Sequence, residues 1–140
     1  MKRLFLDTNV ILDLLGERQP FYKPIAQLIT LADQGKLKVA SSPLSLGTVY
    51  YFLEKYEGTT VAIDKLRKFK VLCDICKMEE NTVEKALNSS FPDFEDALQY
   101  FAALDSGCHI IVTRDAKDFK QSDLPVMDAQ EFIKGHAELW

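Results

Sequence analysis

The sequence lacks a long hydrophobic run, although 47% of its 140 residues are hydrophobic. A membrane-spanning helix needs about 20 consecutive apolar residues, and no segment of the chain approaches that length. The N-terminus begins directly with a short strand-like run and lacks the apolar core of a secretory signal peptide. These absences predict a protein that has no contact with a membrane and resides in the cytoplasm.

Cysteine and histidine are also scarce, with three cysteines and two histidines in the chain. An odd number of cysteines without a secretion signal argues against a disulfide framework. Cys73 and Cys76 have C-x-x-C spacing, but neither His109 nor His136 is spaced to complete a zinc site with them. We therefore expect Cys73, Cys76 and Cys108 to be small, partly buried residues of a strand and its exit.

An excess of positive charge is absent as well, because 17 Lys and Arg against 21 Asp and Glu give a net charge of −4. The chain is therefore not a general binder of polyanions, and any interaction with nucleic acid must rest on local patches and a metal ion. No G-x-G-x-x-G motif follows the first strand-like run, which argues against a nucleotide-binding Rossmann module.

Strand-like apolar runs alternate with segments of helical periodicity, such as residues 60–69, along the whole chain. Strands separated by helices predict right-handed crossovers, and hence an α/β fold. We expect a three-layer α/β/α sandwich with a central, mostly parallel sheet of four to five strands. A length of 140 residues without repeats or linkers predicts one domain over residues 1–140. The predicted strands cover residues 2–6, 36–40, 71–73, 109–113 and 125–127.

Four aspartates occupy positions where functional groups collect in such a fold. Asp7 directly follows the first strand, Asp115 follows the fourth, and Asp93 and Asp96 open an amphipathic helix. The carboxyl ends of parallel strands meet at one edge of the sheet, so we expect these acids to converge there. Carboxylates are costly to bring together unless a cation neutralises them, and Mg²⁺ or Mn²⁺ prefers oxygen ligands. The pattern therefore predicts a divalent metal site.

The acids also have a purely structural interpretation. Asp93 and Asp96, like Asp115 and Asp118, have the three-residue spacing of a helix cap and its partner. Acids in the first turn of a helix also interact favourably with its dipole.

A phosphatase of the haloacid-dehalogenase type also carries an aspartate after its first strand, as this chain carries Asp7. Its chemistry needs a second acid two residues later, where this chain has Asn9, and this argues against that class of enzyme.

Three segments resemble the motifs of one family, the PIN-domain family. Residues 6–13, LDTNVILD, resemble its opening motif, and residues 93–99, DFEDALQ, resemble its central acidic helix. Residues 111–119, IVTRDAKDF, resemble its final T-x-D-x-x-x-F motif. The resemblance extends from about residue 4 to about residue 132. It implies a Rossmann-like sheet and a metal-dependent ribonuclease, similar to toxins of the virulence-associated protein C type in type II toxin–antitoxin modules.

The resemblance implies that Asp7, Asp96 and Asp115 hold Mg²⁺ or Mn²⁺ and activate a water for attack on an RNA phosphodiester. The chain departs from the family at Thr48, where relatives often carry a glutamate. Thr48 would hold a metal-bound water without adding charge, and Asp93 is expected to supply the missing carboxylate. This departure leaves an alternative, a catalytically weakened PIN-like scaffold that binds RNA or a protein partner.

Further side chains near these acids have expected supporting roles. The residues expected to hold carboxylates or waters beside the metal are Asn9, Thr113 and Asp118. The residues expected to bind RNA phosphates are Arg114 and Lys117. The partners that the resemblance implies are an RNA substrate, an antitoxin protein and a second copy of the chain in a homodimer.

Overall fold

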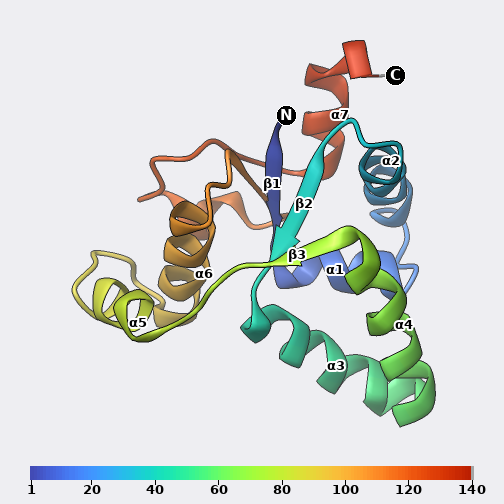
Figure 1. Cartoon of the computed structure of the whole chain (residues 1–140), viewed down its shortest axis with the longest axis horizontal. Coiled ribbons are helices and arrows are strands. Elements are labelled where there is room, and N and C mark those ends of the chain that lie inside the picture. Colours follow the sequence, from blue (N-terminus) through green and yellow to red (C-terminus); the bar gives the residue numbers. More distant parts are fainter. Residues whose placement is uncertain (140) are drawn as a thin grey trace.

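The computed structural model describes residues 1–139 (Figure 1). The strands are β1 (Arg3–Leu6), β2 (Lys38–Ser41), β3 (Cys73–Ile75), β4 (Ile110–Val112) and β5 (Val126–Met127). The α-helices are α1 (Thr8–Leu15), α2 (Tyr22–Asp33), α3 (Pro43–Glu57), α4 (Thr59–Leu72), α5 (Glu80–Leu87), α6 (Phe94–Asp105) and α7 (Ala129–Gly135). The short 3₁₀ helices are η1 (Ala116–Phe119) and η2 (Ala137–Leu139).

All strand pairs of the sheet are parallel, and the strand order is β3-β2-β1-β4-β5. In the central strand β1, Leu4 pairs with Val39 of β2 on one side and with Ile110 of β4 on the other. The chain builds outward from β1 to β3 before it crosses back to β4, so the topology switches direction between β1 and β4. The predicted parallel sheet is confirmed, and the carboxyl ends of β1 and β4 lie side by side.

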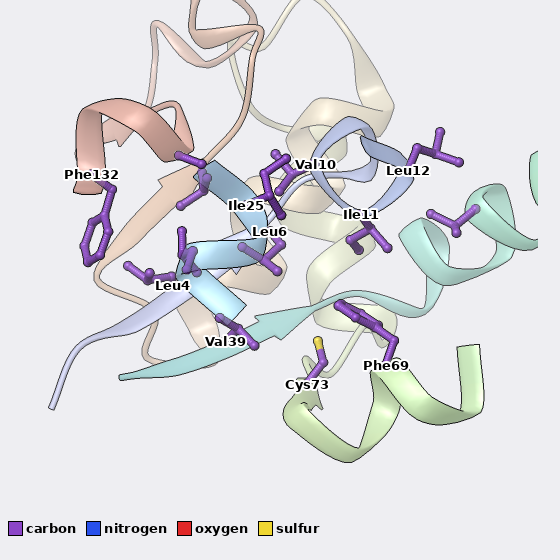
Figure 2. Packing of buried hydrophobic residues seen from close by; sticks show 14 of the residues in the cluster. Leu4, Leu6, Val10, Ile11, Leu12, Ile25, Val39, Phe69, Cys73 and Phe132 are labelled. Carbon is purple, nitrogen blue, oxygen red and sulfur yellow. The ribbon is translucent and has the colours of Figure 1, made fainter. Parts of the chain in front are cut away.

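The two faces of the sheet are covered by different helices. Leu4 and Leu6 of β1 belong to one apolar cluster, together with Phe132 of α7 (Figure 2). Phe5 belongs to a second cluster with Tyr100 of α6, because successive side chains of a strand point to opposite faces. In Figure 1, α5 and α6 lie on one side of the strands, and α1, α2 and α4 lie on the other. This arrangement confirms the predicted three layers.

Helices α3 and α6 both begin with a side-chain cap; the pair Ser42-Pro43 in the sequence predicts the first, and the spacing of Asp93 and Asp96 is typical of the second. Ser42 Oγ accepts a hydrogen bond from the Ser45 N–H at 3.1 Å, and Pro43 occupies the first helical position, where its missing N–H costs nothing. Asp93 Oδ1 accepts a hydrogen bond from the Asp96 N–H at 2.9 Å. Because α3 follows β2 and α6 leads back to β4, both helix N-termini lie near the carboxyl ends of the strands.

The third strand begins later than the sequence predicts. Residues 71–72 were expected to be strand, but they continue α4, and pairing starts only where Cys73 lies opposite Val39. Val71 is 82% exposed, so its apolar side chain does not mark a buried strand. Valine favours strands, but this preference depends on context, and the surrounding tertiary structure overrides it here.

The cysteines are all buried and free. Cys73 lies in β3 and Cys76 follows it directly, as expected for a strand and its exit. Cys108 lies between α6 and β4. All of them therefore serve as small apolar residues of the core.

No helix within residues 1–139 is both long enough and apolar enough to cross a membrane. Trp140, for which the sequence predicts an exposed tail or a partner contact, lies outside the described residues.

Removing a fully buried leucine tests the assigned core. Leu28 of α2 is 0% exposed, and Leu28→Ala leaves a cavity, so we expect the free energy of unfolding to fall by about 2–5 kcal/mol. Denaturant unfolding followed by circular dichroism measures the change. Leu87→Ala is the matched control, because Leu87 is 65% exposed and its loss should cost less than about 1 kcal/mol. Equal costs for both variants would contradict the packing of α2.

Candidate active site

Asp7 directly follows the central strand β1 and caps α1. Its Oδ1 accepts a hydrogen bond from the Thr8 N–H at 2.8 Å, and its Oδ2 accepts one from Thr113 Oγ1 at 2.8 Å. Burial raises the pKa of Asp7, and the hydrogen bonds from Thr113 and Thr8 oppose that rise. The negative charges of Asp115 and Asp118 raise the pKa of Asp7 further. Asp7 is thus a buried acid whose two carboxylate oxygens both accept hydrogen bonds. The sequence did not indicate that Asp7 also caps α1.

Asp96 lies in the first turn of α6 and is half-buried. Partial burial, followed by the repulsion of neighbouring carboxylates, raises the pKa of Asp96 to about 7. The negative charges that add to this rise in pKa belong to Asp93, Asp118, Asp7 and Glu95. Near neutral pH, Asp96 is therefore divided between its protonated and its charged form.

Asn9, in the first turn of α1, links the ends of β1 and β4. Its Nδ2 donates to Asp115 Oδ2 at 3.0 Å and to Thr113 Oγ1 at 3.3 Å. Its Oδ1 accepts from the Arg114 N–H at 3.3 Å, and the Asp115 N–H donates to Thr113 Oγ1 at 3.1 Å. Asn9 and Thr113 therefore bond directly to carboxylates, and they hold Asp115 on the same side of the sheet as Asp7.

A pocket of about 240 Å³ opens where these side chains meet. The residues singled out from the sequence that line it are Asp7, Asn9, Thr48, Asp96, Asp115 and Asp118. The other lining residues are Thr8, Leu12, Leu44, Glu95 and Gln99. Of these, Glu95 and Gln99 were missed by the sequence reasoning, although both lie in the acidic motif of residues 93–99. Asp93 is not among the described residues that line the pocket, since its carboxylate caps α6 instead.

The wall that α3 contributes to the pocket carries no charge. Thr48 Oγ1 donates a hydrogen bond to the Leu44 carbonyl, one turn earlier in the helix, at 3.1 Å. Leu44 and Leu12 supply apolar surface beside it. The acidic groups of the pocket therefore come from the ends of β1 and β4, from η1 and from α6.

A buried polar network lies at the base of the pocket and joins three helices. Gln99 Nε2 donates to Ser45 Oγ at 2.5 Å, and Ser42 Oγ donates to Gln99 Oε1. Ser45 Oγ also lies 2.9 Å from Thr8 Oγ1. The network ties α6 to the first turns of α1 and α3, so it fixes the position of Asp96, one turn before Gln99. Its only sign in the sequence is a glutamine among the apolar positions of α6.

Arg114 and Lys117, both expected to bind RNA, have different surroundings. The Arg114 guanidinium pairs with Asp13 through Nε–Oδ2 at 2.6 Å and Nη2–Oδ1 at 3.2 Å, and it lies 4.1 Å from the centre of the Phe21 ring. The Asp13 side chain is fully buried, whereas the Arg114 side chain is 32% exposed, so Arg114 neutralises a buried carboxylate from the surface. Beside it, Arg114 and Phe21 line a separate hollow of about 530 Å³. Lys117 is exposed on η1 and has no ion-pair partner among residues 1–139.

The sequence pattern of the PIN domain matches residues 3–117, which contain Asp7, Asp96 and Asp115. The chain belongs to the PIN-domain family. Ribonuclease VapC1 of Aquifex aeolicus is 32% identical to it over 138 residues, which cover 95% of this PIN domain and 94% of the relative.

Solved structures share the fold of this PIN domain at low sequence identity. DNA-bound VapBC from Salmonella typhimurium has a TM-score of 0.69 at 15% identity, with 92% of this chain and 99% of that chain covered. VapC20 of Mycobacterium tuberculosis, a sarcin-ricin loop cleaving toxin, has a TM-score of 0.66 at 15% identity, with 84% and 94% covered. VapBC-1 from nontypeable Haemophilus influenzae has a TM-score of 0.68 at 16% identity, with 91% and 98% covered. These similarities show the fold.

The acidic pocket of this PIN domain fits the donor chemistry of a hard divalent cation. Its carboxylates are oxygen donors, and a cation would relieve the repulsion that raises the pKa of Asp96. Within residues 1–139, no three His, Cys, Asp or Glu side chains already form a group that could hold a metal ion. Like charges repel, so the carboxylates stay apart when no cation is present. A bound cation would remove this repulsion and draw them together.

Neutralising Asp96 should stabilise the protein in the absence of divalent cations. Folding raises the pKa of Asp96 from 3.8 to about 7, so the folded state binds more protons than the unfolded state between these values. The free energy of unfolding therefore falls as the pH rises through this window. We expect Asp96→Asn to raise the melting temperature by a few degrees at pH 8 in EDTA, and by less at pH 5, where the folded state has not yet lost the proton of Asp96. Differential scanning calorimetry measures both values.

The matched control for this comparison is Asp33→Asn at the exposed end of α2, which should leave the melting temperature nearly unchanged at both pH values. An Asp96→Asn variant that is less stable than the wild type at pH 8 would show that the Asp96 carboxylate is not under electrostatic repulsion.

Truncating Arg114 should destabilise the fold, because it leaves the fully buried Asp13 carboxylate without its partner. We expect Arg114→Ala to lower the free energy of unfolding by about 3 kcal/mol. Lys117→Ala, on the exposed surface of η1, should change it by less than about 0.5 kcal/mol. Urea unfolding of both variants tests the difference. Similar values for the two variants would mean that the Arg114–Asp13 pair contributes little to the core.

Proposed function

We propose that this PIN domain is a metal-dependent endoribonuclease that hydrolyses RNA phosphodiester bonds as the toxin of a toxin–antitoxin module. The observation that carries the proposal is the convergence of Asp7, Asp96 and Asp115 on one pocket at the carboxyl edge of the sheet. The similarity to a protein named Ribonuclease VapC1 supports RNA as the substrate. The similarity of fold to VapC chains in VapBC complexes supports an antitoxin partner.

In this proposal Asp7, Asp96 and Asp115 hold Mg²⁺ or Mn²⁺, with Asp118 beside them in the pocket. The bound cation would lower the pKa of a water molecule and neutralise charge on the scissile phosphate. Leu12 supplies apolar surface next to the acids, which lowers the local polarity and strengthens their interaction with a cation.

Hydrogen bonds prepare two of the three carboxylates for this role. Thr113 holds Asp7, and Asn9 holds Asp115, so these side chains lose little freedom when they bind a ligand. The raised pKa of Asp96 adds a pH dependence, because a protonated carboxyl must lose its proton before it binds a cation. Activity is therefore expected to increase between about pH 6 and 8.

Lys117 is the side chain proposed to bind an RNA phosphate, because it is exposed two residues after Asp115. Arg114 is proposed to contribute as well, although its pairing with Asp13 offsets its charge. With a net charge of −4 on the whole chain, RNA binding must rest on such local cations. The homodimer, the single domain over residues 1–140 and the cytoplasmic location stay predictions from the sequence.

Cleavage of labelled single-stranded RNA by the purified protein tests the proposal. We expect cleavage in Mn²⁺ or Mg²⁺, none in EDTA, and a loss of at least about 100-fold for Asp96→Asn, since removing a carboxylate from the site costs several kcal/mol of transition-state stabilisation. Asp33→Asn, purified identically, is the control for the loss of one negative charge and should cleave like the wild type.

The alternative is a PIN-like scaffold that binds RNA or a protein partner without cleavage, and the uncharged wall at Thr48 favours it. RNA binding without cleavage, unchanged by Asp96→Asn, would support the scaffold. Cleavage that survives both Asp96→Asn and EDTA would indicate a contaminating nuclease and count against the proposed site.

A further inference from the structure

The acidic pocket contains one carboxylate that the proposed function leaves without a role. Glu95 lies in the first turn of α6, next to Asp96, and lines the pocket together with Thr48 of α3. Thr48 contributes only a hydroxyl, and that hydroxyl is bonded to the Leu44 carbonyl. The α3 side of the pocket therefore offers no charged oxygen, and Glu95 is an additional acid within the same hollow.

The side chain of Asp93 is engaged elsewhere. Its Oδ1 accepts the hydrogen bond from the Asp96 N–H, which satisfies a free donor at the start of α6. Among the described residues, Asp93 is not part of the pocket lining. A carboxylate that leaves this position to bind a cation would break the cap and destabilise the start of α6.

The Glu95 side chain does not cap a helix. Within residues 1–139 its carboxylate has no ion-pair partner at 4.0 Å or less, and its side chain is exposed. Glutamate has one more methylene group than aspartate, so its carboxylate reaches further from the helix. The negative charge of Glu95 is also close enough to Asp96 to raise the pKa of Asp96. Both carboxylates therefore lie near the same part of the pocket.

We propose that Glu95 supplies the carboxylate that the pocket lacks at Thr48, and that it binds the divalent cation together with Asp96. This inference rests on the proposed function, because it concerns the same metal-dependent site. Two neighbouring residues of α6, Glu95 and Asp96, would then both bind the cation, in addition to the acids that follow β1 and β4. This assignment also leaves Asp93 in its capping position.

Glu95 also has a simpler interpretation, since an acid in the first turn of a helix stabilises the helix dipole. Glu80 provides the matched comparison, because it lies in the first turn of α5 and is exposed, but does not line the acidic pocket. Glu95→Gln and Glu80→Gln therefore remove the same charge from the first turn of a helix. Only the first variant removes a carboxylate from the pocket.

Binding of Mn²⁺ to the purified full-length chain, measured by isothermal titration calorimetry at pH 8, tests the inference without an activity assay. We expect Glu95→Gln to weaken Mn²⁺ binding by about 10-fold or more, in the range of losses seen when groups at a metal site are removed. Glu80→Gln should bind within about twofold of the wild type. Asp93→Asn should do the same, because asparagine caps a helix as well as aspartate does.

A second variant tests whether Glu95 replaces a carboxylate at Thr48. Both residues line one pocket, so the double variant Thr48→Glu with Glu95→Gln should recover most of the lost Mn²⁺ affinity. Thermal melts in EDTA establish that each variant is folded. Wild-type affinity in Glu95→Gln, a loss in Asp93→Asn instead, or no recovery in the double variant would each overturn the inference.

The same titration separates this inference from the proposed function. Mn²⁺ binding that Asp7→Asn abolishes and Glu95→Gln leaves intact keeps the proposed metal site and overturns only the role of Glu95. A wild-type chain that binds no Mn²⁺ would overturn both.

Discussion

The parallel pairing of β1 with β4 is the constraint on which the rest of the structure depends. Both strands end at the same edge of the sheet, and the switch in topology between them leaves room there for side chains. Asp7 and Asp115 reach this edge because each follows its strand, and the bonds from Thr113 to Asp7 and from Asn9 to Asp115 join the two strand ends. Helix α6 must run back from this edge to begin β4, so its acidic first turn, with Asp96, lies there too.

The site gathers negative charge at a cost to stability. Burial and the neighbouring carboxylates raise the pKa values of Asp7 and Asp96, which shows that their charged forms are disfavoured in the folded protein. The hydrogen bonds from Thr8 and Thr113 offset part of this cost for Asp7. The guanidinium of Arg114, the cation nearest in sequence to Asp115, is paired with buried Asp13. Proteins commonly retain such repulsion where a ligand is bound, and the divalent cation of the proposed function would relieve it.

Much of the candidate site could be predicted from the sequence, because the local hydrophobic pattern shows which residues follow a strand or begin a helix in an α/β fold. Asp7 and Asp96 were assigned to one site on the order of strands and helices, and the pocket includes both. Glu95 and Gln99 were missed, because a side chain beside a recognised acid does not show which way it points. Asp93 was expected to replace a missing carboxylate, but the structure uses it as a helix cap, and sequence spacing does not distinguish these two roles.

The sequence by itself determined the parallel α/β architecture, the cap that Ser42 supplies before Pro43, and the strand-end position of Asp7. Each follows from hydrophobic periodicity or from hydrogen bonding between residues a few positions apart. Only the tertiary structure decided that α4 continues through Val71, that Arg114 pairs with Asp13, and which acids line one pocket. These features depend on contacts between segments up to about a hundred residues apart, and local sequence carries no record of which side chains such contacts bring together.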